Sequence, residues 1–187
     1  NIEQRAQLMN AALDGLTREL QAAGRKDLRL AVLYRDDAFG QAQLAALAQQ
    51  KYAGLPLSAA DAPGRVRTDA YTGTDGLASL VDAYRVFAPD VVVVLGGTEA
   101  IANFMVPLEN KYVGAEAGTP LPHYLVAETA KVSALGNAAA QTASLGPRIR
   151  GVAATPTTEA LGVFQRFARQ YSAHFDSAGL EWAGDRK

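Results

Sequence analysis

Polar side chains that could bind a ligand stand directly after a short apolar run near the start of this sequence. The run Leu30–Leu33 is followed by Arg35 and, two residues later, by Asp37. Phe39 closes the same turn. A guanidinium and a carboxylate can make charge-assisted hydrogen bonds to a polar small molecule, and an aromatic ring can offer it an apolar face. The alternative is a local role, because acids cap helices at such turns and an aromatic side chain can cover the edge of a core.

Two further candidates follow apolar runs later in the sequence. Thr98 comes after Val91–Leu95 and a pair of glycines. Glu128 comes after Tyr124–Ala127, and no clear helical pattern begins there for it to cap. Its carboxylate could therefore accept a hydrogen bond from the ammonium group of a ligand. The alternative for Glu128 is a solvated acid in a loop.

Hydrophobic periodicity predicts an alternation of helices and strands. The spacing of apolar residues predicts an amphipathic first helix over residues 3–23, ended by Gly24. Strands are expected at 28–34, 66–71 (an edge strand), 90–95, 124–127 and 149–153, and loops at 55–64 and 112–122. Helices are expected from 40 to near 54, at 77–87 and, in irregular form, at 131–143. A further helix should be capped by Thr98 and kinked or shortened near Pro107, and a last helix should have an apolar stripe from Leu161 to Tyr171.

The order of these elements predicts an α/β fold, a three-layer α/β/α sandwich doubly wound around a mostly parallel five-stranded sheet. The four valines at Val91–Val94 fit a strand that is covered on both faces. Each strand is separated from the next by a helix-sized connection, which requires parallel strands with right-handed crossovers. We expect a single lobe over residues 1–175 and a frayed tail over 176–187. Because parallel strands share a direction, the candidate side chains should gather at one edge of the sheet.

The composition is that of an ordinary globular protein, with 187 residues of which 49% are apolar and 20% charged. The formal net charge is −1 and the basic residues are scattered, which argues against nucleic acid or a membrane surface as a partner. No apolar run reaches the roughly 18 residues of a membrane span, so no membrane insertion of this segment is expected. Cysteine is absent, which excludes disulfides and cysteine metal sites.

The inventory of reactive side chains disfavours an enzyme. His123 and His174 stand alone, so neither a metal cluster nor a catalytic triad can be assembled around them. Ser133 and Ser144 lack the surroundings of a nucleophilic serine. The pair Gly96–Gly97 lacks the third glycine of a dinucleotide-binding turn. We therefore expect no catalytic residue, no metal and no cofactor.

Three segments carry further information through their order and spacing, namely Ala31–Gly40, Pro89–Gly97 and Arg150–Pro156. In that order they resemble the type I periplasmic solute-binding proteins, in particular the branched-chain amino acid binding proteins of ABC transporters. The resemblance covers roughly residues 5–175. It implies a flavodoxin-like lobe of a protein in which two lobes, joined by crossing segments, clamp a ligand between them. The chain is similar to the second lobe only, from the helix after the first crossing to a point before the return crossing.

The resemblance also implies roles for individual side chains. Phe39 matches an aromatic residue that lines the ligand side chain, in the turn that holds Arg35 and Asp37. Thr98 matches a residue after the double glycine that contacts the ligand. Glu128 matches an acid that pairs with the amino group of an amino-acid ligand. Two differences are that Phe39 lacks a hydroxyl and that Thr98 stands where an aromatic residue is common.

These implications together describe the ligand-binding lobe of an extracytoplasmic solute-binding or receptor protein, for an amino acid or a similar small polar molecule. Its mechanism would be hinge closure with a second lobe of the same protein, and an ABC permease or a sensor would be its partner. The expected location is the periplasm or another extracytoplasmic space, with a signal or lipoprotein leader removed. The alternative is a signalling or protein-interaction domain that has the same fold and a vestigial pocket.

Overall fold

The computed structural model describes residues 2–58, 60, 62–114, 119–152, 162, 166, 169 and 170. The chain divides into two compact units, residues 1–153 and 154–187, and every element named below belongs to the first. The apolar side chains expected to line a last helix, from Leu161 to Tyr171, lie outside the described residues, as does the tail after residue 175. The lobe boundary at residue 175 stays a prediction.

A five-stranded parallel sheet forms the centre of the first unit, in the order β4-β1-β5-β6-β7. The strands are β1 (Leu30–Arg35), β4 (Val66–Tyr71), β5 (Val91–Leu95), β6 (His123–Val126) and β7 (Ile149–Gly151). Leu30 of β1 stands in register with Val66 on one side and Val91 on the other. Numbered along the chain within this sheet, the order is 2-1-3-4-5, that of flavodoxin-like folds. The expected α/β fold with a parallel five-stranded sheet is confirmed.

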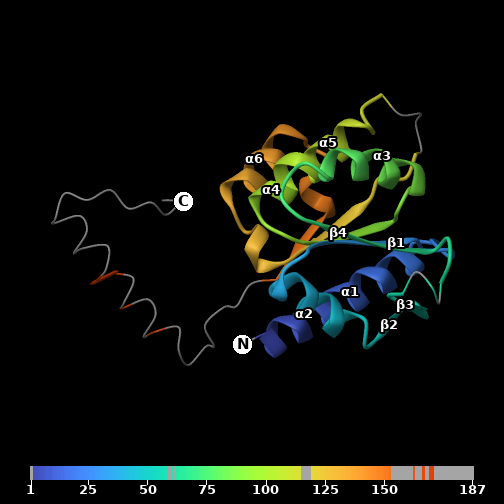
Figure 1. The fold of residues 1–187 in the computed structure, drawn as a ribbon, viewed down its shortest axis with the longest axis horizontal. Helices are drawn as coiled ribbons and strands as arrows, with labels where there is room; N and C mark the ends of the chain where they lie inside the picture. Colours follow the sequence, from blue (N-terminus) through green and yellow to red (C-terminus); the bar gives the residue numbers. More distant parts are fainter. Residues whose placement is uncertain are drawn as a thin grey trace. The chain divides into compact units, whose positions relative to one another are not determined.

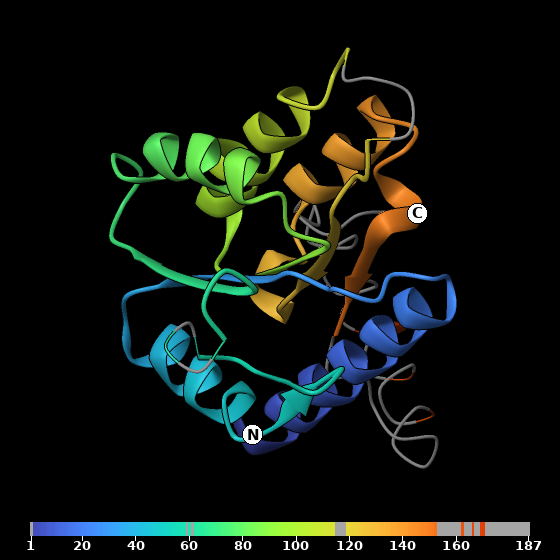
Figure 2. The ribbon, with the colours of Figure 1, turned by 90° about the vertical axis from the view of Figure 1, so that its right-hand side faces the viewer.

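Helices cover both faces of the sheet (Figure 1). One face carries α1 (Ile2–Ala22) and α2 (Ala38–Leu47). The other face carries α3 (Leu77–Phe87), α6 (Ser133–Gln141) and the helical segment after β5. The view turned by 90° shows the same three layers, with the strands between the two groups of helices (Figure 2).

The sheet separates two hydrophobic cores, because successive strand residues point to opposite faces. Val92 and Val94 pack on the side of α3, together with the buried rings of Tyr84 and Phe104. Val91, Val93 and Leu95 pack on the side of α1 and α2. All five side chains of β5 are fully buried, so the apolar run of the sequence is explained by helices on both faces.

The helix after β5 was expected to be kinked or shortened near Pro107. Its irregular part instead lies before Pro107, in the middle of the helix. It consists of α4 (Thr98–Ala100), a π-helical segment η1 (Ile101–Met105) and α5 (Val106–Asn110). Pro107 is the second residue of α5, and because the helical backbone continues from η1 without a break, a carbonyl of the preceding turn receives no N–H from it. The wider π-helical turns directly before it therefore take the place of the expected kink.

A small hairpin replaces the end of the second helix and the start of the expected loop. The helix ends at Leu47, and β2 (Lys51–Tyr52) pairs in antiparallel fashion with β3 (Leu55–Pro56). Ala53 and Gly54 form the turn with positive φ values of 53° and 80°, the conformation that a two-residue hairpin requires. Two-residue strands are too short to show a period, which explains why the sequence pattern missed them. None of the described helices is long and apolar enough to span a membrane.

Candidate functional site

The carboxyl edge of the sheet holds the polar residues that follow β1, β5 and β6. From β1 the chain crosses to β4 on one side, and from β4 it returns to β5 on the other side of β1. This reversal makes the gap between the carboxyl ends of β1 and β5 a topological switch point, where open α/β sheets bind their ligands. Arg35, Phe39, Thr98 and Glu128 all follow strand ends at this edge, as expected for parallel strands.

Arg35 is the central cation of this edge. It is the last residue of β1, and its Nε donates a hydrogen bond of 2.5 Å to Oδ2 of Asp37. Its Nη1 lies 3.7 Å from Oε1 of Glu99, which follows β5. The hydrogen bond to Asp37 is the main cause that raises the pKa of Arg35. The guanidinium thus spans the switch point and remains 43% exposed.

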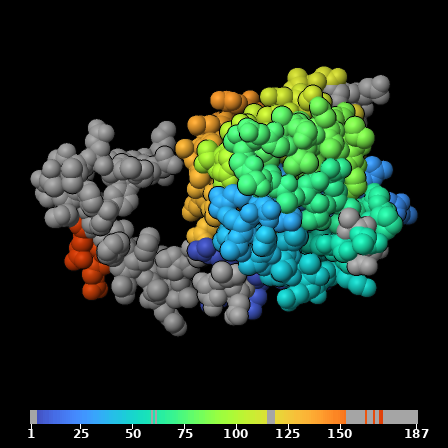
Figure 3. All heavy atoms as spheres, viewed as in Figure 1, coloured from blue at the N-terminus to red at the C-terminus, as the bar shows by residue number. Residues whose placement is uncertain are grey.

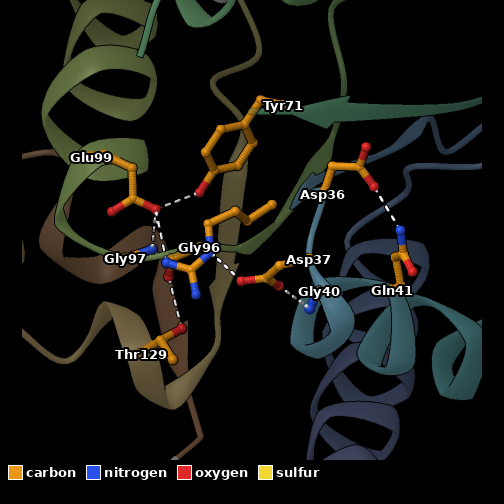
Figure 4. Close-up of polar contacts among 10 residues, drawn as sticks. Asp36, Asp37, Gly40, Gln41, Tyr71, Gly96, Gly97, Glu99 and Thr129 are labelled. Carbon is orange, nitrogen blue, oxygen red and sulfur yellow. Dashed lines mark hydrogen bonds and ion pairs between the residues drawn. The ribbon is translucent and has the colours of Figure 1, made fainter. Parts of the chain in front are cut away.

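Glu99 accepts hydrogen bonds from one residue of another strand and from one of its own segment (Figure 4). The hydroxyl of Tyr71, at the end of β4, donates to Oε1 at 2.7 Å, and the N–H of Gly97 donates to the same oxygen at 3.1 Å. Burial raises the pKa of Glu99, but the hydrogen bonds from Tyr71 and from backbone amides outweigh it, so the pKa is lowered overall. The hydrogen bonds from Tyr71 and Gly97 both go to Oε1, and the Glu99 side chain remains 26% exposed.

The first of the two glycines after β5, Gly96, is explained by the close approach of Tyr71. A Cβ on Gly96 would lie 2.1 Å from the Tyr71 hydroxyl and 2.9 Å from Cβ of Ala100. The carbonyl of Gly96 also accepts a hydrogen bond of 2.8 Å from Oγ1 of Thr129, after β6. Glycine at position 96 therefore allows the ends of β4, β5 and β6 to approach one another.

Asp37 caps α2, since its Oδ1 accepts a hydrogen bond of 2.8 Å from the N–H of Gly40. This bond is the largest cause that lowers the pKa of Asp37, helped by the Arg35 side chain. A Cβ on Gly40 would lie 2.0 Å from the carbonyl oxygen of Arg35, so this turn admits only glycine there. The local role considered for Asp37 is thus present, and a role toward a ligand stays a prediction.

Phe39 and Thr98 frame the switch point from its two sides. Phe39 lies in the first turn of α2 and is half-buried. Thr98 is the first residue of α4 and its side chain is exposed. The cap of α4 is Gly97, without a side-chain hydrogen bond, so the expectation that Thr98 caps this helix is wrong. Contact of either side chain with a ligand stays a prediction.

Glu128 begins a short 3-10 helix, η2 (Glu128–Ala130), and lies against Arg5 of α1. The Arg5 Nε and the Glu128 Oε2 are 2.9 Å apart, and the two side chains are 35% and 31% exposed. The two atoms are close but not aligned as a hydrogen bond, so the contact is an ion pair. Glu128 is therefore partly exposed and paired with a cation of the chain itself, and its contact with a ligand stays a prediction.

An apolar cleft of about 230 Å³ opens beside Glu128, at the carboxyl ends of β6 and β7. It is lined by Val126, Ala127, Lys131, Leu135, Ile149, Gly151 and Val152. The sequence does not indicate this cleft, because its lining comes from three segments with no common pattern. Among the described residues, no group of histidine, aspartate and glutamate is arranged to hold a metal ion.

No protein-family model matches this chain, and no curated protein matches it. Among solved structures, the chain is similar to the crystal structure of a substrate-binding periplasmic protein from Ralstonia solanacearum. The identity is 17% and the TM-score 0.42. The similarity covers 63% of this chain and 29% of that protein, so the chain spans less than a third of its length.

Proposed function

We propose that this chain is the ligand-binding lobe of an extracytoplasmic solute-binding or receptor protein, and that a small polar, amino-acid-like molecule binds at the carboxyl edge of the sheet. The observation that carries the proposal is the charged pair across the switch point. Arg35 from β1 and Glu99 after β5 lie within 3.7 Å, and both side chains remain partly exposed. A polar ligand there would meet a cation and an acceptor oxygen at once.

The residues around this pair would divide the recognition of such a ligand. Arg35 and Asp37 supply charged contacts, and the half-buried Phe39 supplies an apolar face. Thr98 offers a hydroxyl from the opposite side of the switch point. Glu128 would bind the amino group once Arg5 is displaced. The adjoining apolar cleft of about 230 Å³ is large enough for an aliphatic side chain.

One lobe covers only part of a ligand, whereas good small-molecule sites bury about 70–90% of the ligand surface. In the proposed protein a second lobe outside this sequence closes over the same edge, and the ligand stabilises the closed state. The closed form would then be the one that an ABC permease or a sensor recognises. Such a protein works in the periplasm or another extracytoplasmic space.

The test is a titration of the isolated chain, followed residue by residue by amide NMR. Leucine, glutamate and arginine are added separately up to millimolar concentration, and we expect weak binding with shifts at 35–41, 96–99 and 126–129. The matched control is Arg18→Gln, a loss of the same charge at an exposed position of α1, which should leave the shifts unchanged while Arg35→Gln abolishes them. Shifts confined to other segments, or tight binding that survives Arg35→Gln, would contradict the proposal.

A second candidate function is a signalling or protein-interaction domain with a vestigial pocket. The observation that favours it is the Arg5–Glu128 ion pair. In this pair a cation of the chain itself faces the Glu128 carboxylate that was expected to bind the ligand. In that case no amino acid would shift the amides of this edge, even in the Arg5→Gln variant. The same titration therefore separates the two candidates.

A further inference from the structure

The outer edge of β4 pairs with no other strand in the described part of the chain. β4 is the last strand on its side of the sheet and is paired with β1 alone. In the space-filling view, residues of β4 reach the surface toward the viewer, between those of α2 below and those of α3 above (Figure 3). An open strand edge presents a row of backbone donors and acceptors with which another strand can pair.

Every second residue of β4 turns its backbone groups toward β1. At the two ends of the ladder, the carbonyls of Arg65 and Tyr71 accept hydrogen bonds of 2.9 Å from β1 and from the residue that follows it. Because the parallel ladder between these ends is regular, the β4 residues that bond to β1 in between are Arg67 and Asp69.

The residues between these turn their backbone groups away from β1. Thr68 and Ala70 each present an N–H and a carbonyl at the open edge, and no hydrogen bond joins these groups to the described residues. Val66 presents only its carbonyl, since its N–H donates to the carbonyl of Ala62 at 3.0 Å. Ala70 is exposed, so the edge is accessible at this point. A partner strand would therefore find both donors and acceptors along this edge.

Two opposite charges are held on one face of the same strand. Arg67 and Asp69 are two residues apart, so their side chains lie on the same face of the sheet. The Arg67 Nε donates to Oδ2 of Asp69 at 2.6 Å, and the Arg67 Cζ lies 5.3 Å from the ring centre of Tyr84 in α3. The Arg67 and Asp69 side chains remain 32% and 20% exposed. A cation and an anion thus stand in a fixed order at the open edge.

These charges select one antiparallel register between two copies of the edge. When Thr68 stands opposite Thr68 of the other copy, Arg67 of each copy stands opposite Asp69 of the other. The next registers that use the same backbone groups place Arg67 opposite Arg67, or Asp69 opposite Asp69. Opposite charges that face each other directly are stabilising and like charges are destabilising, so only the first register is complementary. Charges on edge strands commonly prevent pairing, whereas this order permits it in one register.

We infer that two copies of this chain associate through the open edges of β4, antiparallel and with Thr68 opposite Thr68, to form one continuous sheet. The two Thr68 residues bond to each other through both N–H groups, and the N–H of each Ala70 donates to the carbonyl of Val66 of the other copy. Such a twofold contact uses the same surface on both copies and closes as a dimer. One strand pair buries a small area, so the dimer is weak and transient. The contact does not involve Arg35 or Glu99 and is independent of the proposed solute site.

Amide hydrogen exchange followed by NMR tests the edge residue by residue, at micromolar and at millimolar chain concentration. The amides of Thr68 and Ala70 should exchange rapidly in dilute solution and gain protection as the concentration rises. The matched internal control is the amides of Arg67 and Asp69, which bond to β1 and should be protected at both concentrations. Thr68 and Ala70 amides that are unprotected at both concentrations, or protected at both, overturn the inference.

Sedimentation over the same concentrations tests the register through its charges. Asp69→Arg should weaken the dimer by about tenfold, because it sets like charges opposite each other. The double variant Arg67→Asp and Asp69→Arg restores the alternation of charge and should restore the dimer. Asp82→Arg, the same change at an exposed position of α3, should leave the dimer as it is. A chain that stays monomeric at millimolar concentration, a double variant that dimerises no better than Asp69→Arg, or an equal loss in Asp82→Arg overturns the inference.

Discussion

The hydroxyl of Tyr71 donates a hydrogen bond of 2.7 Å to Oε1 of Glu99 and so joins the end of β4 to the segment after β5, over the end of β1 between them. Arg35 approaches the same oxygen from β1. Three neighbouring strands therefore meet at one carboxylate. The proposed solute site is held by this meeting point rather than by any one loop.

Replacing Tyr71 by phenylalanine should lower the free energy of unfolding by about 1–2 kcal/mol at neutral pH, since a largely buried hydrogen bond to a carboxylate is lost. The lowered pKa of Glu99 contributes stability that is complete above its ordinary value of 4.5 and disappears as the pH falls through the lowered pKa. The deficit of the variant should therefore shrink in acid. Chemical denaturation at neutral and acidic pH measures it, and a deficit that is constant with pH would mean that Glu99 is not the acceptor.

Replacing Gly96 by alanine should destabilise the lobe by about 1–3 kcal/mol, because the new methyl group would lie 2.1 Å from the Tyr71 hydroxyl. The matched control is Gly136→Ala, inside α6 and without a neighbour within 4 Å of the new Cβ. That change should instead stabilise by about 0.5–1 kcal/mol through helix propensity. In the double variant Gly96→Ala and Tyr71→Phe, the loss of stability should be smaller than the sum of the losses in the two single variants. The reason is that the Tyr71 hydroxyl, the atom nearest to the new methyl group, is absent.

Arg148 forms a buried fork with Glu109 beneath β6, with Nη1 at 3.0 Å from Oε1 and Nη2 at 2.5 Å from Oε2. Both residues are at least nine-tenths buried, and Tyr124 donates to the same carboxylate at 2.7 Å. Arg148→Met should cost about 3–5 kcal/mol, since it leaves Glu109 buried without its cation. Adding Glu109→Leu should recover part of the loss.

The control for this pair is Arg150→Met, two residues further along the chain. Arg150 lies 3.7 Å from Glu19, and both side chains are about half exposed or more. An exposed pair of this kind contributes about 0–1 kcal/mol to stability. The variant should therefore unfold at nearly the same urea concentration as the unmodified chain. Urea denaturation of the variants measures both effects, and equal losses for Arg148→Met and Arg150→Met would contradict the buried fork.

Replacing Arg5 by glutamine should strengthen the binding of an amino acid at the carboxyl edge by about threefold to tenfold, because the ligand ammonium no longer displaces a guanidinium from Glu128. NMR titration with leucine measures the change. The effect should vanish in the double variant Arg5→Gln and Glu128→Gln. Weaker binding by Arg5→Gln would instead show that Arg5 itself contacts the ligand.

The five parallel strands could be predicted because apolar runs and helix-length connections alternate along the chain, whereas their order in the sheet comes from the structure. Val91–Val94 is apolar without a break, and helix-length connections force parallel pairing. The hairpin at 51–56 could not be predicted, since two residues per strand carry no period. The π-helical turns before Pro107 were also missed, because the sequence shows a proline but not the register change before it.

Only those parts of the candidate site that directly follow a strand could be predicted from the sequence. Arg35, Asp37 and Thr98 could be placed at this edge because they stand after apolar runs, and their contact with a ligand stays a prediction. Tyr71 was missed because a tyrosine at the end of an alternating edge strand has the pattern of a core residue. The Arg5–Glu128 pair joins the first helix to the turn after β6, and nothing local in either segment indicates the other. Pairings of this kind come from tertiary packing.

Val92 and Val93 are adjacent in the chain and yet belong to different interiors, because the sheet divides the lobe into two. Side chains on opposite faces share few contacts, so changes on one face are energetically independent of changes on the other. The helices that carry Arg5 and Phe39 can therefore diverge in sequence while the layer beneath Tyr112 keeps its packing. Such a partition lets the two interiors of one small domain change in sequence at separate rates.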